Sequence, residues 1–150
     1  MISKQAKNAI AFALEKHANQ VDKAGQPYFL HVLRVALSVA PLGENYFIAA
    51  ILHDVVEDCG VELSYIAEEW GQEIAEAVDS VSRREKPIKE TYMSLIHRAS
   101  LNVIGREVKL ADIEDNSSPE RIFYLPLEMQ GIIKRYEKAK KYLLDSKVVS

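Results

Sequence analysis

The sequence contains little cysteine, no long apolar run and no excess of charge of one sign. One cysteine occurs in 150 residues, which excludes an intramolecular disulfide and a zinc site with several cysteine ligands. If a metal ion binds, histidine and carboxylate side chains must therefore hold it. Lysine and arginine number 19 against 22 aspartates and glutamates, for a net charge of -3. This balance gives no electrostatic basis for nonspecific binding of nucleic acid.

The sequence also lacks a segment that predicts membrane insertion or export. No apolar run approaches the roughly 20 residues that a membrane span requires. The N-terminus does not combine a basic region with a continuous apolar one. Because 48% of the residues are hydrophobic, the chain can form a sizeable core. We expect one cytoplasmic domain over residues 1–150 that binds neither membranes nor nucleic acid. The sequence does not indicate its oligomeric state.

Apolar residues recur at helical spacing almost throughout the chain, and the alternation typical of half-buried strands is hard to find. The sequence therefore predicts an all-α fold. Gly25 and Pro27 separate the first two expected helices. The helices are expected at residues 6–20, 28–40, 46–59, 63–70, 71–81, 88–100 and 132–144, with a further apolar-periodic segment at 102–121.

One apolar segment is interrupted by polar groups that a core does not normally contain. The uncharged run at residues 47–52 is followed by His53-Asp54 and then by Glu57-Asp58. A buried carboxylate without a partner costs several kcal/mol, so these groups need compensation. In a continuous helix Asp54, Glu57 and Asp58 share one face. An acidic pair before a glycine is, by itself, more often a solvated surface.

His31 and Asp112 are flanked by apolar residues on other predicted helices. Taken alone, His31 is more often a core histidine, and Asp112 could be a helix-end acceptor. Together with His53 and Asp54 they form a set of nitrogen and oxygen ligands. Such a set suits a divalent transition ion such as manganese, iron, cobalt or zinc. The combined pattern favours one bound metal ion, whose charge would compensate the buried carboxylates.

Four sequence blocks occur in an order that can be compared with known families: KHANQVDKAGQPYFLH, AAILHDVVEDC, WGQEIAEAVDSVSR and VKLADIEDN. They resemble RKxGxPYxxH, AAxLHDVVEDT, FGxxVAxLVxGVTK and IKLADRLHN of the RelA/SpoT-type HD-domain hydrolases. This group includes small stand-alone alarmone hydrolases, which remove pyrophosphate from the ribose 3′ position of guanosine tetra- and pentaphosphate. The resemblance covers residues 6–116 and implies a single HD-type helical bundle with a metal site between helices.

The resemblance also implies roles for individual residues. The metal, usually manganese in this family, would be held by His31, His53, Asp54 and Asp112. The hydrolytic acidic pair would be Glu57 and Asp58. The substrate would be contacted around Asp22, Lys23, Tyr28 and Asn116. Weaker candidates for phosphate contacts are Arg83, Arg84 and Lys109, because polar loops and helix surfaces are usually just solvated.

Three positions depart from the family pattern. Asp22 stands where the family has an arginine that can stack on a purine base. Ile113 and Asp115 replace an arginine and a histidine. We expect all three changes to lie around the substrate rather than around the metal. The predicted function is therefore a metal-dependent phosphohydrolase acting on nucleotide pyrophosphates. The alternatives are a nucleotidase or other phosphoester hydrolase, and a nucleotide-binding module without turnover.

Overall fold

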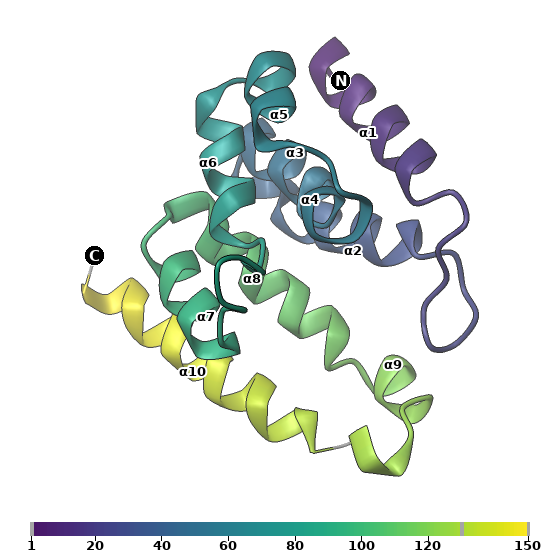
Figure 1. The fold of residues 1–150 in the computed structure, drawn as a ribbon, viewed down its shortest axis with the longest axis vertical. Helices are drawn as coiled ribbons and strands as arrows, with labels where there is room; N and C mark the ends of the chain where they lie inside the picture. Colours follow the sequence, from purple (N-terminus) through teal and green to yellow (C-terminus); the bar gives the residue numbers. More distant parts are fainter. Residues whose placement is uncertain (1, 130, 150) are drawn as a thin grey trace.

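The computed structural model describes residues 2–129 and 131–149, which fold into a bundle of helices (Figure 1). The α-helices are α1 (Lys4–Lys16), α2 (Phe29–Val39), α3 (Glu44–Leu52), α4 (Val55–Cys59), α5 (Leu63–Trp70), α6 (Gln72–Ser80), α7 (Tyr92–Ser100), α8 (Val103–Asn116), α9 (Pro119–Phe123) and α10 (Ile132–Val149). Two 3-10 helices, η1 (Ala40–Leu42) and η2 (Leu127–Met129), lie between them. No strand occurs in these described ranges, where one isolated bridge pairs Val21 with Pro27. The predicted all-α class is confirmed.

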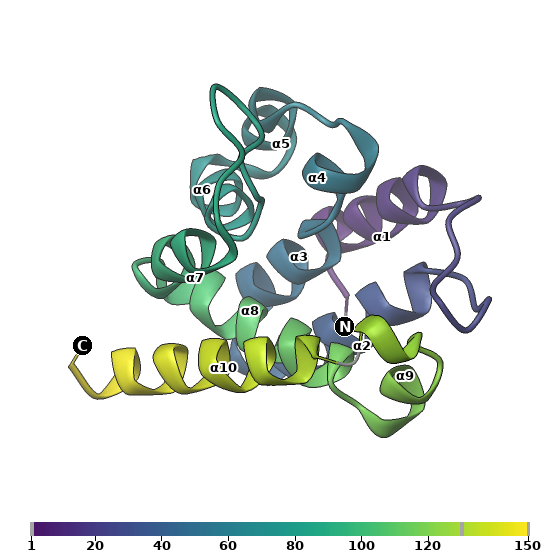
Figure 2. The ribbon, with the colours of Figure 1, turned by 60° about the horizontal axis from the view of Figure 1, so that its bottom comes forward.

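Helix α3 lies at the centre of the bundle (Figure 2). Its only charged residue is Glu44, and its last five residues, Ile48–Leu52, are all buried. A helix that is apolar on every side has to be surrounded by other elements. Helices α1, α2, α6 and α8 pack against it. This packing fixes the C-terminal end of α3, where His53 follows.

A second core cluster lies where α10 packs against α7 and α8. Ile113 of α8 is 1% exposed in this cluster and packs with Leu143 and Ala139 of α10. Helix α10 runs alongside α8 at the bottom of the view in Figure 2. Across residues 2–129 and 131–149, none of the helices combines the length and apolar character needed to span a bilayer.

The prediction of one continuous helix over residues 46–59 is wrong. Helix α3 ends at Leu52, α4 begins at Val55, and a turn at His53-Asp54 separates them. The Nδ1 atom of His53 lies 2.6 Å from the carbonyl oxygen of Ala50, to which the backbone N–H of His53 also donates at 3.3 Å. Adjacent residues of a continuous helix point about 100° apart. The turn lets two adjacent side chains, His53 and Asp54, reach the same point.

Other helix boundaries differ from the expected ones by a few residues. The bounds of α5 are as predicted, but the first helix ends at Lys16, the expected helix at 88–100 begins at Tyr92, and the last helix continues to Val149. Thr91 starts α7 because its side chain accepts a hydrogen bond from the backbone N–H of Ser94. The segment 102–121 divides into α8 and α9.

Ionic hydrogen bonds hold the loop between α6 and α7. The carboxylate of Glu90 accepts from Nε and Nη2 of Arg98, both at 2.8 Å, and from the backbone N–H of Arg84 at 3.1 Å. Arg98 also donates to the carbonyl oxygens of Asp79 and Ser82, at 2.8 Å and 2.7 Å. The hydrogen bonds from Arg98 lower the pKa of Glu90 from 4.5 to about 2.

We predict that Glu90→Gln destabilises the protein at pH 7 by about 1–3 kcal/mol, because it removes the charge that Arg98 bonds. The pKa of Glu90 is lower in the folded than in the unfolded chain. Its stabilising contribution is therefore fully present above pH 4.5 and is lost as the pH falls towards 2. Urea unfolding of both proteins at pH 7, 5 and 3.5 measures the difference. A difference that does not shrink at the lowest pH would contradict this role.

Candidate metal centre and its surroundings

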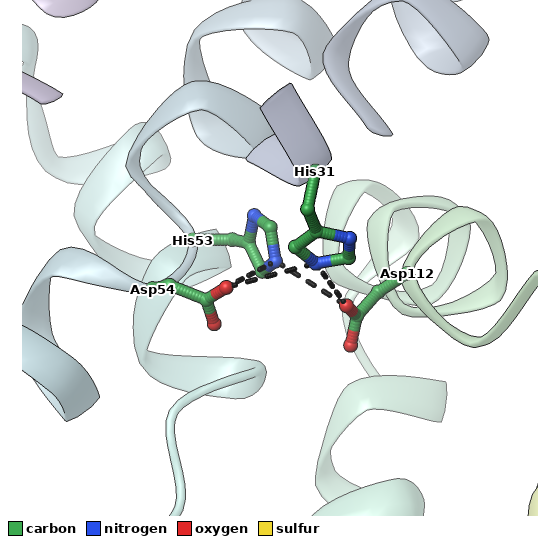
Figure 3. A group of neighbouring side chains, drawn as sticks. All are labelled: His31, His53, Asp54 and Asp112. Atoms are coloured by element: carbon green, nitrogen blue, oxygen red, sulfur yellow. Dashed lines mark ion pairs between the residues drawn. The ribbon is translucent and has the colours of Figure 1, made fainter. Parts of the chain in front are cut away.

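The structure brings the predicted metal ligands together from separate elements (Figure 3). His31 comes from α2, His53 and Asp54 from the turn between α3 and α4, and Asp112 from α8. All four residues are buried, and one ligand atom of each lies within 4.8 Å of the others. His31 Nε2 is 3.0 Å from Asp112 Oδ1, and His53 Nε2 is 3.0 Å from Asp54 Oδ2.

The hydrogen bonds at Nδ1 of the two histidines indicate which ring nitrogen can bind a metal ion. His53 Nδ1 contacts the carbonyl oxygen of Ala50, and His31 Nδ1 lies 2.7 Å from Asp115 Oδ2. Because both oxygens are acceptors, each Nδ1 carries a hydrogen and donates it. In the neutral form of each ring, the lone pair is then on Nε2. Both Nε2 atoms are buried, and their neighbours at 3.0 Å are carboxylate oxygens of Asp112 and Asp54.

Acceptor atoms this close together need positive charge between them. Burial alone would lower the pKa of both imidazoles, but the adjacent carboxylates outweigh it and raise the pKa of His31 and His53. Burial likewise opposes ionisation of the carboxylates, yet the imidazoles lower the pKa of Asp54 to about 2. A divalent cation satisfies all four ligand atoms at once, and the N/O ligand set is typical of transition metals. The residues therefore fit a divalent metal ion.

Three further side chains donate to the carboxylate ligands. The hydroxyl of Tyr28 donates to Asp54 Oδ2 at 2.7 Å, while Lys109 Nζ and Asn116 Nδ2 donate to Asp112 at 2.9 Å and 3.2 Å. Tyr28, expected at the substrate, thus contacts a metal ligand. The expectation that Lys109 lies on a helix surface is wrong, since its side chain is only 12% exposed and pairs with Asp112.

The predicted catalytic pair, Glu57 and Asp58, lies on α4 with both residues exposed to solvent. Partial desolvation of Glu57, together with the negative charge of Asp54, raises its pKa to about 7. Gln20 donates to Asp58 Oδ2 at 3.1 Å and accepts from His17 Nδ1 at 2.8 Å. This His17–Gln20 contact was not predicted from the sequence. Glu57 can therefore exchange a proton near neutral pH, and Asp58 is held in place.

A pocket adjoins the metal centre at Asn116, which both lines it and donates to Asp112. Lys23 and Asp22, which the resemblance places near the substrate, lie in its wall. Its other lining residues are Ala24, Arg121, Leu125, Met129, Ile132 and Tyr136. Sequence reasoning missed Arg121 and Tyr136, which follow the last recognisable block and appeared only as parts of a polar turn and an amphipathic helix.

Asp22 has a structural role besides its position in the pocket wall. Its Oδ1 accepts from the backbone N–H groups of Ala24 at 2.9 Å and Gln26 at 3.0 Å. Aspartate commonly closes turns in this way. A substitution at Asp22 therefore changes both the local turn and the charge of the pocket.

The expectation that Ile113 and Asp115 surround the substrate is wrong. Ile113 points into the core against α10. Asp115 contacts His31, one of the predicted metal ligands, and accepts hydrogen bonds from Arg34 and Arg121. The change at Asp115 therefore affects the surroundings of the metal ligands.

Arg83 and Arg84, considered for phosphate contacts, belong to the loop between α6 and α7. Arg83 Nε donates to the carbonyl oxygen of Glu90 at 2.7 Å, and Arg84 Nη2 lies 3.4 Å from Asp79 Oδ2. Neither lines the pocket beside the metal centre. The contacts of Arg83 and Arg84 therefore indicate that both residues stabilise the loop.

Comparison with known families gives a match to the HD domain over residues 9–103, more than half of the chain. The chain belongs to the HD-domain family. The predicted resemblance to HD-domain hydrolases is thereby confirmed. The matched region contains His31, His53 and Asp54 and ends before Asp112.

Curated relatives of this HD domain are much longer proteins. The guanosine-3′,5′-bis(diphosphate) 3′-pyrophosphohydrolases of Aquifex aeolicus and Haemophilus influenzae are 37% and 38% identical over 122 and 114 residues. These alignments cover 76% and 69% of this chain and 17% of each relative. A probable GTP pyrophosphokinase of Mycobacterium leprae is 34% identical over 131 residues, covering 82% of this chain and 16% of that protein. The chain thus spans about a sixth of the length of these relatives.

The fold matches a solved structure of similar length. That structure is described as "A metazoan ortholog of SpoT hydrolyzes ppGpp and plays a role in starvation responses". The TM-score is 0.77 at 24% sequence identity, over 96% of this chain and 85% of the other. The similarity establishes that this HD domain has the same helical fold.

We predict that the purified protein binds about one divalent metal ion per chain and that His53→Ala abolishes binding, since it removes a buried ligand. Elemental analysis after dialysis against metal-free buffer measures the content. His97→Ala is the matched control, because His97 is exposed on α7 and contacts Tyr142 instead. Equal metal content in His53→Ala and the parent protein would disprove the ligand assignment.

Proposed function

We propose that this HD domain is a metal-dependent phosphohydrolase that removes pyrophosphate from the ribose 3′ position of guanosine 3′,5′-bis(diphosphate) or a related nucleotide. The observation that carries the proposal is the convergence of two imidazole nitrogens and two carboxylates at one buried point. The names of the relatives from Aquifex aeolicus and Haemophilus influenzae support the reaction and the substrate class. We further propose that residues 1–150 form one domain that acts in the cytoplasm, where nucleotides are available.

The ligands His31, His53, Asp54 and Asp112 would hold the ion, which we propose to be Mn²⁺ from the family resemblance, with iron, cobalt and zinc as alternatives. When bound, such an ion lowers the pKa of water and polarises a phosphoryl oxygen. The hydrogen bonds from Tyr28, Lys109 and Asn116 orient the two carboxylate ligands. Held in this way, the ligands need little rearrangement when the ion binds.

The acidic pair supplies the proton transfers of the proposed reaction. A water molecule attacks phosphorus and gives a proton to Glu57, whose pKa near 7 suits a general base at neutral pH. The bond between phosphorus and the ribose 3′ oxygen breaks, and that oxygen takes up a proton. The products are pyrophosphate and a nucleoside 5′-diphosphate. Asp58, which accepts a hydrogen bond from Gln20, would orient the water or share its proton.

The pocket beside the metal centre has the side chains that a nucleotide requires. Lys23 and Arg121 provide positive charge for phosphate groups, and Asn116 provides an amide for hydrogen bonding. Tyr136 provides an aromatic ring in the same wall, next to apolar side chains. This combination of cations and an aromatic ring supports a nucleotide rather than a simple phosphate ester as the substrate.

Two other functions remain as alternatives, each connected to a specific residue. Asp22 places a negative charge in the pocket wall, which favours a nucleotidase or a phosphoester hydrolase with a less highly charged substrate. A binding module without turnover would have no need of the exposed Glu57–Asp58 pair beside the metal ligands. The pair therefore favours an enzyme.

We predict that Glu57→Gln lowers pyrophosphate release by about 100- to 10,000-fold, because the amide cannot accept the proton. Metal content should stay at the parent value, since Glu57 is not a proposed ligand. Glu62→Gln is the matched control: Glu62 is an exposed carboxylate after α4 and should retain full activity. Undiminished release by Glu57→Gln would remove this residue from the mechanism.

A second prediction distinguishes two effects of residue 22 on the substrate: repulsion of phosphate by its charge, and recognition of the base. Asp22→Asn keeps a side-chain oxygen for the turn but removes the charge, so kcat/KM for nucleotide polyphosphates should rise by up to about fivefold, as expected at a screened site. Asp22→Arg adds a planar cation that can stack on a base.

The substrates compared are guanosine and adenosine polyphosphates, with release of phosphate and pyrophosphate measured for each. An equal gain on both indicates electrostatics alone, whereas a further gain of Asp22→Arg on guanosine substrates alone indicates base recognition. If neither variant improves any substrate, Asp22 does not repel the ligand.

A further inference from the structure

A cluster of charged side chains lies at the edge of His31 that faces away from the metal centre. It consists of His31 and Arg34 from α2, Asp115 from α8 and Arg121 from α9, and is called here the Asp115 cluster. Asp115 Oδ2 lies 2.7 Å from His31 Nδ1. Arg34 Nε donates to Asp115 Oδ1 at 2.7 Å, and Arg34 Nη2 donates to Oδ2 at 3.1 Å. Arg121 Nη1 donates to Oδ2 at 3.2 Å.

The direction of the hydrogen bond to His31 follows from the chemistry of its neighbours. Arg121 Nη1 lies 2.6 Å from His31 Nδ1, but a guanidinium nitrogen can only donate. Asp115 can only accept while it is ionised, and the two arginines keep it ionised. When His31 Nε2 binds the proposed ion, the hydrogen of the ring is on Nδ1, and His31 Nδ1 and Arg121 Nη1 then both donate to Asp115 Oδ2. This leaves the lone pair of His31 on Nε2, directed at the metal centre.

The two histidine ligands are thus held by different kinds of acceptor. His53 Nδ1 donates to the neutral backbone carbonyl of Ala50. His31 Nδ1 donates to a carboxylate from another helix, 84 residues further along the chain. Since a carboxylate accepts a stronger hydrogen bond than a neutral carbonyl, it holds the ring more firmly. It also makes the opposite nitrogen a better electron-pair donor.

We propose that Asp115 is a positioning residue of the metal centre, which fixes the tautomer and orientation of His31 so that its Nε2 atom binds the ion. Asp115 does not touch the ion itself. The inference rests on the proposed metal centre and does not depend on the identity of the substrate.

The two arginines of the cluster differ in what else they contact. Arg34 makes a two-pronged contact with Asp115, while its side chain remains 46% exposed. Arg121 contacts Asp115 and also lines the pocket with Lys23 and Asn116. Arg34 therefore serves mainly to hold Asp115, whereas Arg121 connects this support to the wall of the substrate pocket.

Calorimetric titration of the chelator-treated protein with Mn²⁺ alone tests the proposal. Asp115→Ala should weaken Mn²⁺ binding by about 10- to 100-fold, the usual effect of removing such a support. Asp115→Asn retains an acceptor oxygen and should weaken it by less than about tenfold. Glu114→Ala is the matched control, because Glu114 is the preceding residue of α8, is 67% exposed and pairs with Lys140. It should bind Mn²⁺ like the parent protein.

A second measurement distinguishes positioning from a general structural role. The visible spectrum of bound Co²⁺ depends on the geometry of its ligands, so Asp115→Ala should change the band shape at full occupancy. Thermal unfolding in chelator measures the effect on the metal-free fold. A lowered midpoint combined with unchanged Mn²⁺ affinity and an unchanged Co²⁺ spectrum would overturn the proposal. If Asp115→Ala does not fold, Asp115→Asn serves for the same comparison, with the smaller effects expected.

Failure of this inference and failure of the proposed function give different results. A parent protein that binds no Mn²⁺ would refute the metal centre and, with it, the role of Asp115. Equal Mn²⁺ affinity in the parent protein and both Asp115 variants would refute the positioning role alone. Mn²⁺ binding that depends on Asp115, in a protein that hydrolyses none of the nucleotides, would support the positioning role and refute the proposed function.

Discussion

The structure brings acceptor atoms of four buried residues to one point, and their mutual repulsion has to be offset by positive charge. The four residues are His31, His53, Asp54 and Asp112. Two lone pairs and two carboxylates at one point repel one another unless positive charge lies between them. Several features follow from holding these atoms together. Helix α3, whose last five residues are apolar and buried, fixes the position of the turn that follows it. The turn at residues 53–54 lets neighbouring side chains converge, and α2 and α8 supply the remaining proposed ligands by packing beside α3. A helix continuing through residue 54 would have pointed the two side chains apart.

Much of this arrangement could be predicted from the sequence because its signals are local. Helical periodicity gave the fold class, and the order of the four sequence blocks gave the family and the four candidate ligands, which the structure places side by side. The turn at residues 53–54 could not be predicted, because apolar residues continue on both sides at helical spacing. At this turn the His53 side chain contacts the carbonyl oxygen of Ala50, a detail that periodicity does not contain.

Contacts between distant parts of the chain account for the remaining differences. Asp115 and His31 are 84 residues apart, and nothing in the sequence near either residue indicates that they meet. Arg121 and Tyr136 reach the pocket from a segment without a recognisable motif. Lys109 occupies a position that looks exposed on a helix but faces Asp112. Of the three departures from the family pattern, Asp22 lies in the pocket wall, Asp115 contacts His31, and Ile113 packs in the core. The proposed determinants of substrate choice and of metal support thus lie at separate positions around the four candidate ligands.

X-ray absorption of the Mn²⁺-loaded protein tests the central claim most directly, because it reports the atoms around the ion independently of turnover. A centre built from His31, His53, Asp54 and Asp112 predicts a shell of nitrogen and oxygen only, with the outer scattering of two imidazole rings. Scattering from sulfur, which would involve Cys59, or an imidazole signal that is absent from the parent protein, would contradict the account.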